Sequence, residues 1–366
     1  MPTSRELLSW VTLTRAPELS IATLATALDA LQSAEGLLEA GDRLRARAGL
    51  PPATRAFLQG ASAKPSAAEE AWLAHPDHHL LAFNDARYPR ALRELAGSPI
   101  ALYVEGDPTI LNATQLAIVG SRHPTDQGRQ NAFEFARHLA GRGLCITSGL
   151  AQGIDTEAHR GALAARGLTI AVLGTGPDLV YPRSNEALAA AIARSGALVS
   201  EFALGTALAR ANFPQRNRII AGLSRGTLVI EAARQSGSLV TARLAGEAGR
   251  EIFAIPGSIH NPLSRGCHQL IRQGAKLTET ADDIMTELDF SAEFARALPT
   301  APAAGMDKDH KILLDALGFD PTDLDALVAR TGFNAQAVSS MVLILELEGH
   351  VQAAPGGRYS RVSRSP

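Results

Sequence analysis

The feature that most limits the fold of this chain is a series of short apolar runs between residues 115 and 255. The runs are Leu116–Val119, Leu144–Thr147, Thr169–Leu173, Ala197–Val199, Thr227–Ile230 and Ile252–Ile255. Stretches of roughly a dozen residues with helical patterning separate most of them. Continuous apolar runs that alternate with helices are typical of a parallel sheet buried on both faces. We therefore predict an α/β domain with a doubly wound, mostly parallel sheet.

The flanking segments predict two smaller domains. Apolar residues recur at helical spacing over residues 5–75, which favours a small helical bundle that packs on its neighbour, over residues 1–80. A SAM-like or helix-hairpin-helix domain that binds the DNA backbone is the alternative, although no clear glycine hairpin precedes Gly36. A short strand, Ile100–Tyr103, then leads into the extended Rossmann-like domain, which we assign to residues 81–291.

The C-terminal part predicts a winged helix. Residues 292–309 are rich in Ala, Pro and Thr and indicate a linker. Residues 310–366 follow as three helices and a hairpin, with the last helix at about Ala335 to Glu348 and the hairpin tip at Pro355–Gly357.

Composition excludes several classes of protein. The chain has 366 residues and a net charge of −2, so contact with a polyanion requires a local basic patch. Its two cysteines, Cys145 and Cys267, lie far apart, which argues against a disulfide scaffold or a cysteine zinc site and fits a reducing cytoplasm. No leader pattern and no run of 18 apolar residues occurs in the sequence. We expect a soluble cytoplasmic protein with no membrane contact, metal or cofactor.

The loops that follow the apolar runs predict phosphate binding. In an open parallel sheet, ligands bind beyond the carboxyl ends of the strands. Most of these loops carry Gly or Ser beside a helix start, where backbone N–H groups and the helix dipole attract anions. The candidate residues of this kind are Gly120, Ser121, Ser148, Gly149, Ser236, Gly237 and Ser238.

The segment 202–230 indicates a single-strand site. It contains no acidic residue and has four arginines, namely Arg210, Arg216, Arg218 and Arg225. Phe213 lies among them, directly before Pro214, which is well placed to start a helix. Guanidinium groups bind phosphates and an aromatic ring stacks on a base. The alternative is that Phe213 belongs to the core and the arginines form a solvated helix face.

Motifs of the common nucleotide enzymes and hydrolases are absent. No Walker A, His-Glu-x-x-His or Gly-x-Ser-x-Gly sequence occurs, and the dinucleotide pattern that begins at Gly174 has Leu179 at its third glycine position. Asp155 and His159 lie four residues apart at a helix start, so they could share a face. Without an orienting group and a nucleophile, we predict that Asp155 caps the helix and that His159 packs or forms a hydrogen bond. We predict no catalytic residue.

Several strings together resemble the DNA-processing protein A (DprA/Smf) family over about residues 85–285. They are Ile118-Val-Gly-Ser-Arg122, Ser148-Gly-Leu-Ala-Gln-Gly-Ile-Asp155, Phe213-Pro-Gln-Arg-Asn-Arg-Ile-Ile-Ala-Gly222, Val229-Ile-Glu-Ala232, Ser236-Gly-Ser-Leu239 and Phe253-Ala-Ile-Pro-Gly257. The resemblance implies a cytoplasmic protein that protects incoming single-stranded DNA in natural transformation, forms a homodimer and loads the RecA recombinase. It implies no catalytic reaction.

The same resemblance assigns roles to residues. Arg122 would contact phosphate, and Phe213, Arg216, Asn217 and Arg218 would line the strand-binding groove. Arg210 stands where relatives often have Lys, which keeps the charge but changes the hydrogen-bond geometry.

A different class of protein remains as the alternative. Nucleotide phosphoribohydrolases of the lysine-decarboxylase-like group use a similar domain and carry a Pro-Gly-Gly-x-Gly-Thr loop followed by Glu. The corresponding strand here leads into Glu231-Ala-Ala-Arg-Gln-Ser-Gly-Ser, so that motif is absent.

The winged helix is not expected to read duplex DNA. Residues 334–349 contain no Lys or Arg and include Glu346 and Glu348, so phosphates would repel this helix. We expect the domain to contact protein or to regulate the core. The fragment 306–366 should therefore show no micromolar binding to duplex DNA in fluorescence anisotropy at physiological salt, and such binding would contradict the assignment.

Overall fold

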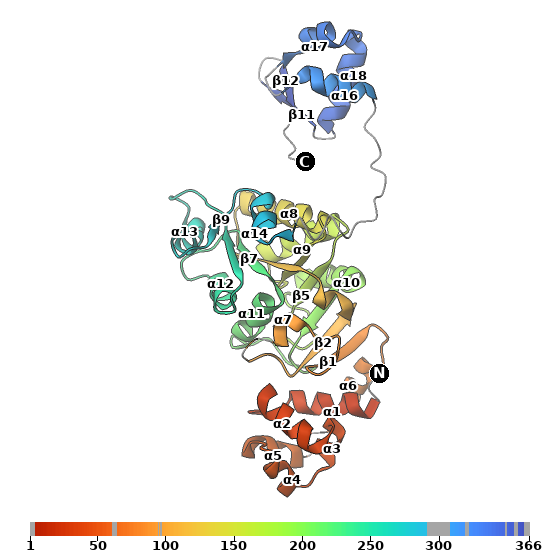
Figure 1. The fold of residues 1–366 in the computed structure, drawn as a ribbon, viewed down its shortest axis with the longest axis vertical. Helices are drawn as coiled ribbons and strands as arrows, with labels where there is room; N and C mark the ends of the chain where they lie inside the picture. The colour runs from red at the N-terminus through yellow and green to blue at the C-terminus, as the bar shows by residue number, and fades with distance from the viewer. Residues whose placement is uncertain are drawn as a thin grey trace. The chain divides into compact units, whose positions relative to one another are not determined.

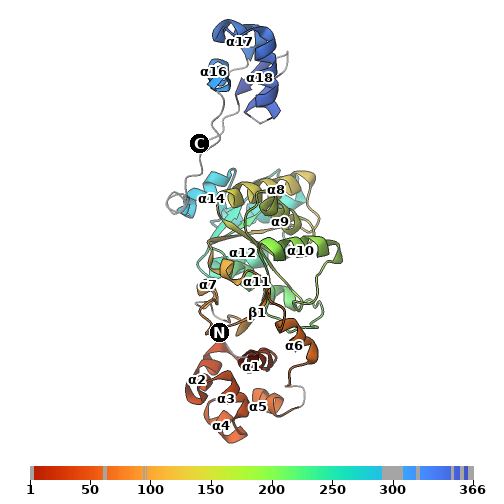
Figure 2. The ribbon, with the colours of Figure 1, turned by 90° about the vertical axis from the view of Figure 1, so that its right-hand side faces the viewer.

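The computed structural model describes residues 4–60, 64–93, 95, 97–290, 308–318, 322–347, 350–354 and 358–361. The chain forms two compact units, Met1–Arg296 and Ala297–Pro366 (Figures 1 and 2). No helix in the described ranges is long and apolar enough to cross a bilayer.

A nine-stranded sheet organises the first unit. Its strands are β1 (His78–Ala82), β2 (Ala101–Gly106), β3 (Gln115–Val119), β4 (Cys145–Ser148), β5 (Thr169–Val172), β6 (Ala197–Ser200), β7 (Gly226–Val229), β8 (Glu251–Ala254) and β9 (Lys276–Leu277). Their order is β1-β2-β6-β5-β4-β3-β7-β8-β9. In this order, β1 pairs with β2 and β2 with β6 in antiparallel fashion, and every later pair, from β6–β5 to β8–β9, is parallel. The predicted doubly wound sheet is confirmed, and every apolar run named above contributes a strand. The sequence did not predict β1 or β9.

Helices cover both faces of this sheet (Figure 1). They are α7 (Arg90–Arg93), α8 (Asp126–Gly141), α9 (Ile154–Ala164), α10 (Glu186–Ser195), α11 (Asn212–Leu223), α12 (Gly237–Glu247), α13 (Arg265–Arg272) and α14 (Ala281–Glu287). Alternate residues of β3 point to opposite layers, as the pleat requires. Leu116 and Ile118 pack with α8 and α9, whereas Ala117 and Val119 pack with α11 and α12.

The direction in which the chain adds strands reverses between β3 and β7. From β3 the chain moves outward through β4, β5 and β6, and it then returns to place β7 on the other side of β3. The loops after β3 and β7 therefore diverge, which opens a crevice at the carboxyl end of two adjacent strands. Open α/β sheets bind ligands at such a switch point.

The N-terminal helices pack on the antiparallel border of the sheet. They are α1 (Ser4–Thr14), α2 (Ile21–Leu31), α3 (Ala34–Glu39), α4 (Asp42–Arg47), α5 (Pro52–Gln59) and α6 (Ala67–Leu73). Their buried residues, such as Trp10 and Leu24, form one core with Leu80 of β1 and Tyr103 of β2. The Tyr103 hydroxyl lies 3.1 Å from the Thr14 hydroxyl. The predicted helical bundle that packs on its neighbour is confirmed.

The second unit is a small winged helix, as predicted. It contains α16 (Lys308–Leu317), β10 (Thr322–Asp323), α17 (Leu324–Thr331), α18 (Ala335–Leu347), β11 (Val351–Ala354) and β12 (Arg358–Arg361). Its strands form a sheet of order β10-β12-β11, and its own core includes Leu313, Leu327 and Val342. The predicted hairpin tip 355–357 and most of the predicted linker 292–309 lie outside the described residues.

The buried Glu231, just beyond β7, ties the two diverging loops together. Its carboxylate accepts hydrogen bonds from the Thr125 N–H at 2.9 Å and the Thr125 hydroxyl at 2.6 Å, at the start of α8. Its backbone oxygen accepts from the Ser121 N–H at 2.8 Å. Gly128 leaves the space for this carboxylate, because a Cβ there would lie 2.5 Å from its carbon.

Replacement of Glu231 by Ala should destabilise the first unit. The change removes two hydrogen bonds to an ionised group and leaves a helix N-terminus without its acceptor, which we expect to lower the free energy of unfolding by about 2 kcal/mol. Urea denaturation followed by circular dichroism measures the change. The control is Glu247→Ala, which removes an exposed ion pair with Arg243 and should cost less than about 0.5 kcal/mol. Equal losses in the two variants would contradict this role.

Candidate nucleic-acid interface

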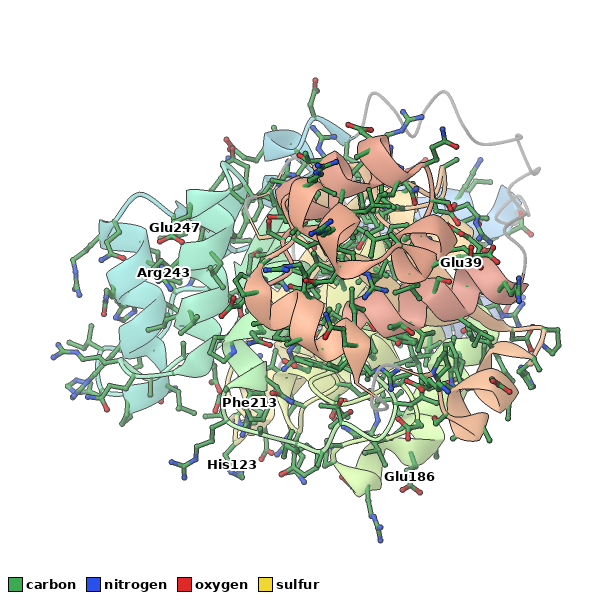
Figure 3. All side chains as sticks on the ribbon, turned by 90° about the horizontal axis from the view of Figure 1, so that it is seen from below. Glu39, His123, Glu186, Phe213, Arg243 and Glu247 are labelled. Atoms are coloured by element: carbon green, nitrogen blue, oxygen red, sulfur yellow. The ribbon has the colours of Figure 1, made fainter. Side chains whose placement is uncertain are left out.

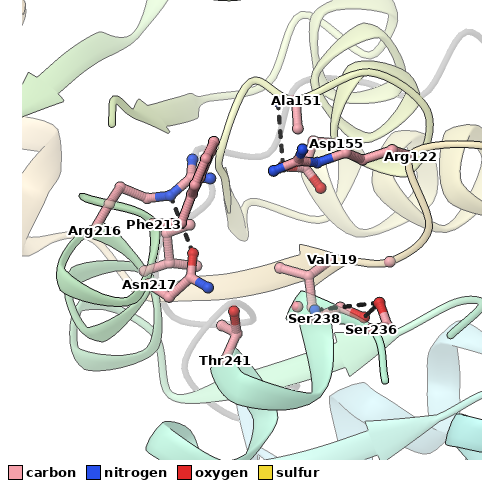
Figure 4. Close-up of a pocket in the computed structure, with 13 residues that line it drawn as sticks. Val119, Arg122, Ala151, Asp155, Phe213, Arg216, Asn217, Ser236, Ser238 and Thr241 are labelled. Carbon is pink, nitrogen blue, oxygen red and sulfur yellow. Dashed lines mark hydrogen bonds between the residues drawn. The ribbon is translucent and has the colours of Figure 1, made fainter. Parts of the chain in front are cut away.

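A cavity of about 400 Å³, here called the inner pocket, lies at the switch point between β3 and β7 (Figure 4). It is built from the end of β3, the loops after β3, β4 and β7, and the N-terminal parts of α9, α11 and α12. The residues that line it are Val119, Gly120, Arg122, Ala151, Asp155, Phe213, Arg216, Asn217, Ile220, Ser236, Gly237, Ser238 and Thr241. Segments more than one hundred residues apart in the chain thus meet at one edge of the sheet.

Arg216 of α11 forms the floor of the inner pocket and is only 5% exposed. Its Nη1 donates to the carbonyl oxygens of Gly149 and Val172, the latter at 2.8 Å. Its Nε donates to the Asn217 side-chain oxygen at 3.1 Å. Gly149 has to lack a side chain here, because a Cβ would lie 1.9 Å from Nη1. The guanidinium therefore fastens α11 to the loop after β4 and to the end of β5.

Asp155, in the first turn of α9, supplies a buried negative charge beside this guanidinium. Its Oδ2 accepts from the backbone N–H groups of Gly149 at 3.2 Å and Ala151 at 3.3 Å. Burial raises the pKa of Asp155, and the charge of Arg216 acts in the opposite direction. Burial likewise lowers the pKa of Arg216, against the attraction of Asp155. The loop after β4 thus carries its own anion, which occupies amides that the sequence predicted to be open to phosphate.

Phe213 and Arg122 form a cation–π pair at the mouth of the inner pocket. The Arg122 guanidinium carbon lies 4.7 Å from the centre of the Phe213 ring. Arg122 is exposed and Phe213 is half-buried in the first turn of α11. A planar cation and a planar ring are therefore presented together to solvent, as contact with a phosphate and a base requires.

The loop after β7 adds a helix N-terminus. Ser236 is the N-cap of α12, and its hydroxyl accepts from the Ser238 N–H at 3.3 Å. Gly237 is exposed, with nothing within 4 Å of the position of a Cβ. The positive end of the α12 dipole is thereby directed at the same pocket as Arg122.

The structure gathers most of the predicted site residues and separates the others. Those that line the inner pocket are Gly120, Arg122, Phe213, Arg216, Asn217, Ser236, Gly237 and Ser238. Arg210 is exposed on the segment that leads into α11. Ser121 lies behind the wall of the pocket, where its N–H is bonded to Glu231 and its carbonyl oxygen accepts from Ile154.

Two predicted residues lie away from the pocket. Ser148 is fully buried, and its hydroxyl donates to the Ile118 carbonyl oxygen at 2.6 Å. This bond joins β4 to the neighbouring strand β3, so the side chain stabilises the sheet and does not face the pocket. Arg218 forms an ion pair with Glu201 and lines another cavity. Arg225, counted above in the arginine-rich segment, precedes β7 and so lies at the opposite end of the sheet. The four arginines of this segment are thus divided among different surfaces.

His159 does not form an acid–base pair with Asp155. It is fully buried, and burial lowers its pKa to about 3. Its Nδ1 lies 2.7 Å from the Thr169 hydroxyl, which itself donates to the Ile146 carbonyl oxygen, so Nδ1 carries the proton. The prediction that His159 is a packing and hydrogen-bonding residue is confirmed.

The prediction that Asp155 caps its helix is wrong, because the N-cap of α9 is Gly153 and Asp155 accepts N–H groups of the preceding loop instead. Sequence reasoning treated the Gly-rich loop after β4 as a cradle for an external phosphate. The signal that was available is the Gly153-Ile-Asp155 string at a helix start, because an aspartate there accepts nearby N–H groups before any ligand arrives.

Most of the chain matches known protein families in sequence. Residues 79–289 match the family model of DNA recombination-mediator protein A, and residues 297–357 match that of the DprA winged helix domain. The protein Smf of Escherichia coli (strain K12) is 45% identical over 303 residues, which cover 80% of this chain and 80% of that protein. The DNA processing protein DprA of Streptococcus pneumoniae is 45% identical over 206 residues, which cover 56% of this chain and 73% of that protein.

Solved structures resemble the chain as well. The X-ray structure of DNA processing protein A from Streptococcus pneumoniae has a TM-score of 0.65 at 34% identity, covering 78% of this chain and 98% of that one. The protein from Helicobacter pylori, whose structure addresses its single-stranded DNA binding mode, has a TM-score of 0.54 at 30% identity. It covers 59% of this chain and 98% of its own.

Replacement of Asp155 by Asn tests the charge balance of the floor. Asn keeps an oxygen for the two N–H groups but leaves the buried Arg216 without its compensating charge. We expect the free energy of unfolding to fall by about 3 kcal/mol in urea denaturation. Asp126→Asn, at an exposed position in α8, is the control and should cost less than about 1 kcal/mol. A neutral Asp155→Asn would show that Asp155 does not compensate Arg216.

Proposed function

The chain belongs to the DNA recombination-mediator protein A family, and we propose that it binds single-stranded DNA in the inner pocket without catalysing a reaction. The observation that carries the proposal is the Arg122–Phe213 pair at the mouth of that pocket. The single-stranded DNA binding mode described for the Helicobacter pylori relative supports it.

Each group in the proposed site has a physical task. Arg122 and Arg210 neutralise phosphates, and the exposed N-terminus of α12 attracts one more. The Phe213 ring stacks on a base, which contributes about 1–3 kcal/mol whatever the base. Gly120, Asn217, Ser236, Gly237 and Ser238 shape the surface that the strand follows.

Other predicted residues act from behind this surface. Arg216 fixes the helix that carries Phe213, and Gly149 makes room for its guanidinium. Ser121, Ser148 and Arg218 have their polar groups engaged within the protein, so we assign them to support rather than to contact.

Family membership is the basis for the wider role. We propose that the protein protects incoming strands in natural transformation, loads the RecA recombinase and acts as a homodimer in the cytoplasm. We also propose the domain limits given above, with a winged helix that contacts protein. Stimulation of RecA strand exchange by the wild type but not by Arg122→Ala would support the loading step.

Glu231 argues against the enzymatic alternative. A phosphoribohydrolase would need a carboxylate free to act on the sugar, and both oxygens of Glu231 are engaged by Thr125. Release of free base from a nucleoside monophosphate, lost in Glu231→Gln, would establish the enzyme instead.

Removal of the cations at the mouth should weaken binding in a salt-dependent way. Arg122→Ala and Arg210→Ala should each raise the Kd for labelled oligo-dT, by about tenfold for Arg122. Each should also reduce the slope of log K against log salt by about 0.7 for every phosphate that the variant no longer neutralises. Fluorescence anisotropy at two salt concentrations measures both, with matched duplex as a second ligand. Arg225→Ala, at the opposite end of the sheet, should change neither quantity, and unchanged slopes in Arg122→Ala and Arg210→Ala would refute the proposal.

A further inference from the structure

A second cavity adjoins the inner pocket across the Arg122–Phe213 pair. This outer pocket measures about 230 Å³ and shares Arg122, Ala151, Phe213 and Arg216 with the inner pocket. Its outer wall adds Tyr181 and Leu208, from the segments after β5 and β6. Phe213 and His123, which both line it, lie near each other in Figure 3. The two cavities are therefore two compartments of one groove.

Tyr181 offers a free aromatic surface in the outer pocket. Its side chain is 50% exposed, and its hydroxyl has no hydrogen-bond partner within the described part of the chain. Leu208, on the same wall, is 37% exposed. Two large apolar side chains left in water around one cavity indicate a surface that a ligand covers.

The charge of this compartment is of one sign. No acidic side chain is among the residues that line it, all of which the structure describes, and Arg122 and Arg216 supply positive charge. The inner pocket, by contrast, contains Asp155. An apolar and aromatic wall beside the exposed guanidinium of Arg122 fits a planar base joined to a phosphate.

The dimensions suit a single base. An apolar cavity of about 150 Å³ admits benzene, and the outer pocket is larger at about 230 Å³. The exposed Gln152 amide also lines it and can bond to the edge of a base.

We propose that the outer pocket is a second nucleotide subsite of the groove, in which Tyr181 stacks on the base next to the one held by Phe213. The inference rests on the single-strand binding proposed above. Arg122 lies on the wall between the compartments, where it contacts the phosphate that links the two nucleotides. A strand thus passes over the Arg122–Phe213 pair with one base on each side.

Abasic substitutions in DNA, combined with protein variants, test this arrangement. The ligand is the shortest oligo-dT that binds with full affinity, because a longer homopolymer would shift its register to avoid the lesion. Each position is made abasic in turn. For the wild type we expect two adjacent positions at which the lesion weakens binding, each by about tenfold, as the loss of one stacked base predicts.

The variants assign each position to a ring. In Tyr181→Ala the effect of the lesion should vanish at one position, and in Phe213→Ala it should vanish at its neighbour, because a missing base and a missing ring are not additive. Tyr181→Phe keeps the ring and should retain the wild-type profile. Leu179→Ala removes a side chain that is 39% exposed and lines neither compartment, and it should also leave the profile unchanged.

The outcomes separate the two proposals. Absence of oligo-dT binding, or an unchanged affinity in Phe213→Ala, would overturn the proposed function and this subsite with it. If Phe213→Ala weakens binding while Tyr181→Ala keeps the wild-type affinity and abasic profile, the second subsite alone is refuted. Thermal denaturation shows whether the Tyr181 variants fold as the wild type does, which the exposure of this side chain leads us to expect.

Discussion

The buried guanidinium of Arg216 fixes the arrangement on which the rest of this site depends. It joins the carbonyl oxygens of Gly149 and Val172 to α11, so the loop after β4, the end of β5 and this helix hold one geometry. Phe213 lies less than one turn earlier on the same helix, and its ring is therefore positioned by a group that is itself inaccessible. Burial of a guanidinium costs desolvation energy that its hydrogen bonds and the nearby charge of Asp155 only offset, so Arg216 contributes little net stability. Its value here is to place a half-exposed ring.

Asp155 divides the amides of the site between protein and ligand. By accepting from Gly149 and Ala151, it satisfies the N–H groups nearest to Arg216 and keeps the floor close to neutral. What remains for an outside anion is the rim, where Arg122 and the start of α12 are exposed. The groove therefore has a neutral, rigid floor and a positive edge. That combination favours a polymer lying along the edge over a small anion enclosed below it.

The sheet could be predicted because its central strands are buried on both faces, which produces runs that no other structure explains as well. The border strands β1 and β9 were not predicted, because neither forms a continuous apolar run. β1 begins with His78 and His79, and β9 spans only two residues. For the site, the sequence placed Arg122 and Phe213 correctly at one pocket. It could not tell which of Arg216 and Arg218 is buried. Residues two apart on a helix point in nearly opposite directions, but only the fold shows which side faces the core. The sequence also did not identify Tyr181, whose exposure is a property of the folded surface.

A chain with a net charge of −2 has little general attraction for a polyanion. The structure sharpens this constraint, because Arg216 is compensated by Asp155 and Arg218 by Glu201. Few of the arginines in the segment 202–230 therefore remain available to contact phosphates. Phosphate contacts alone would then give weak binding that falls steeply with salt. Stacking on exposed rings does not depend on salt in this way, so a groove with few free charges has to obtain much of its affinity from aromatic surface. Stacking on such a surface is sequence-tolerant, as the proposed binding of strands of any sequence requires.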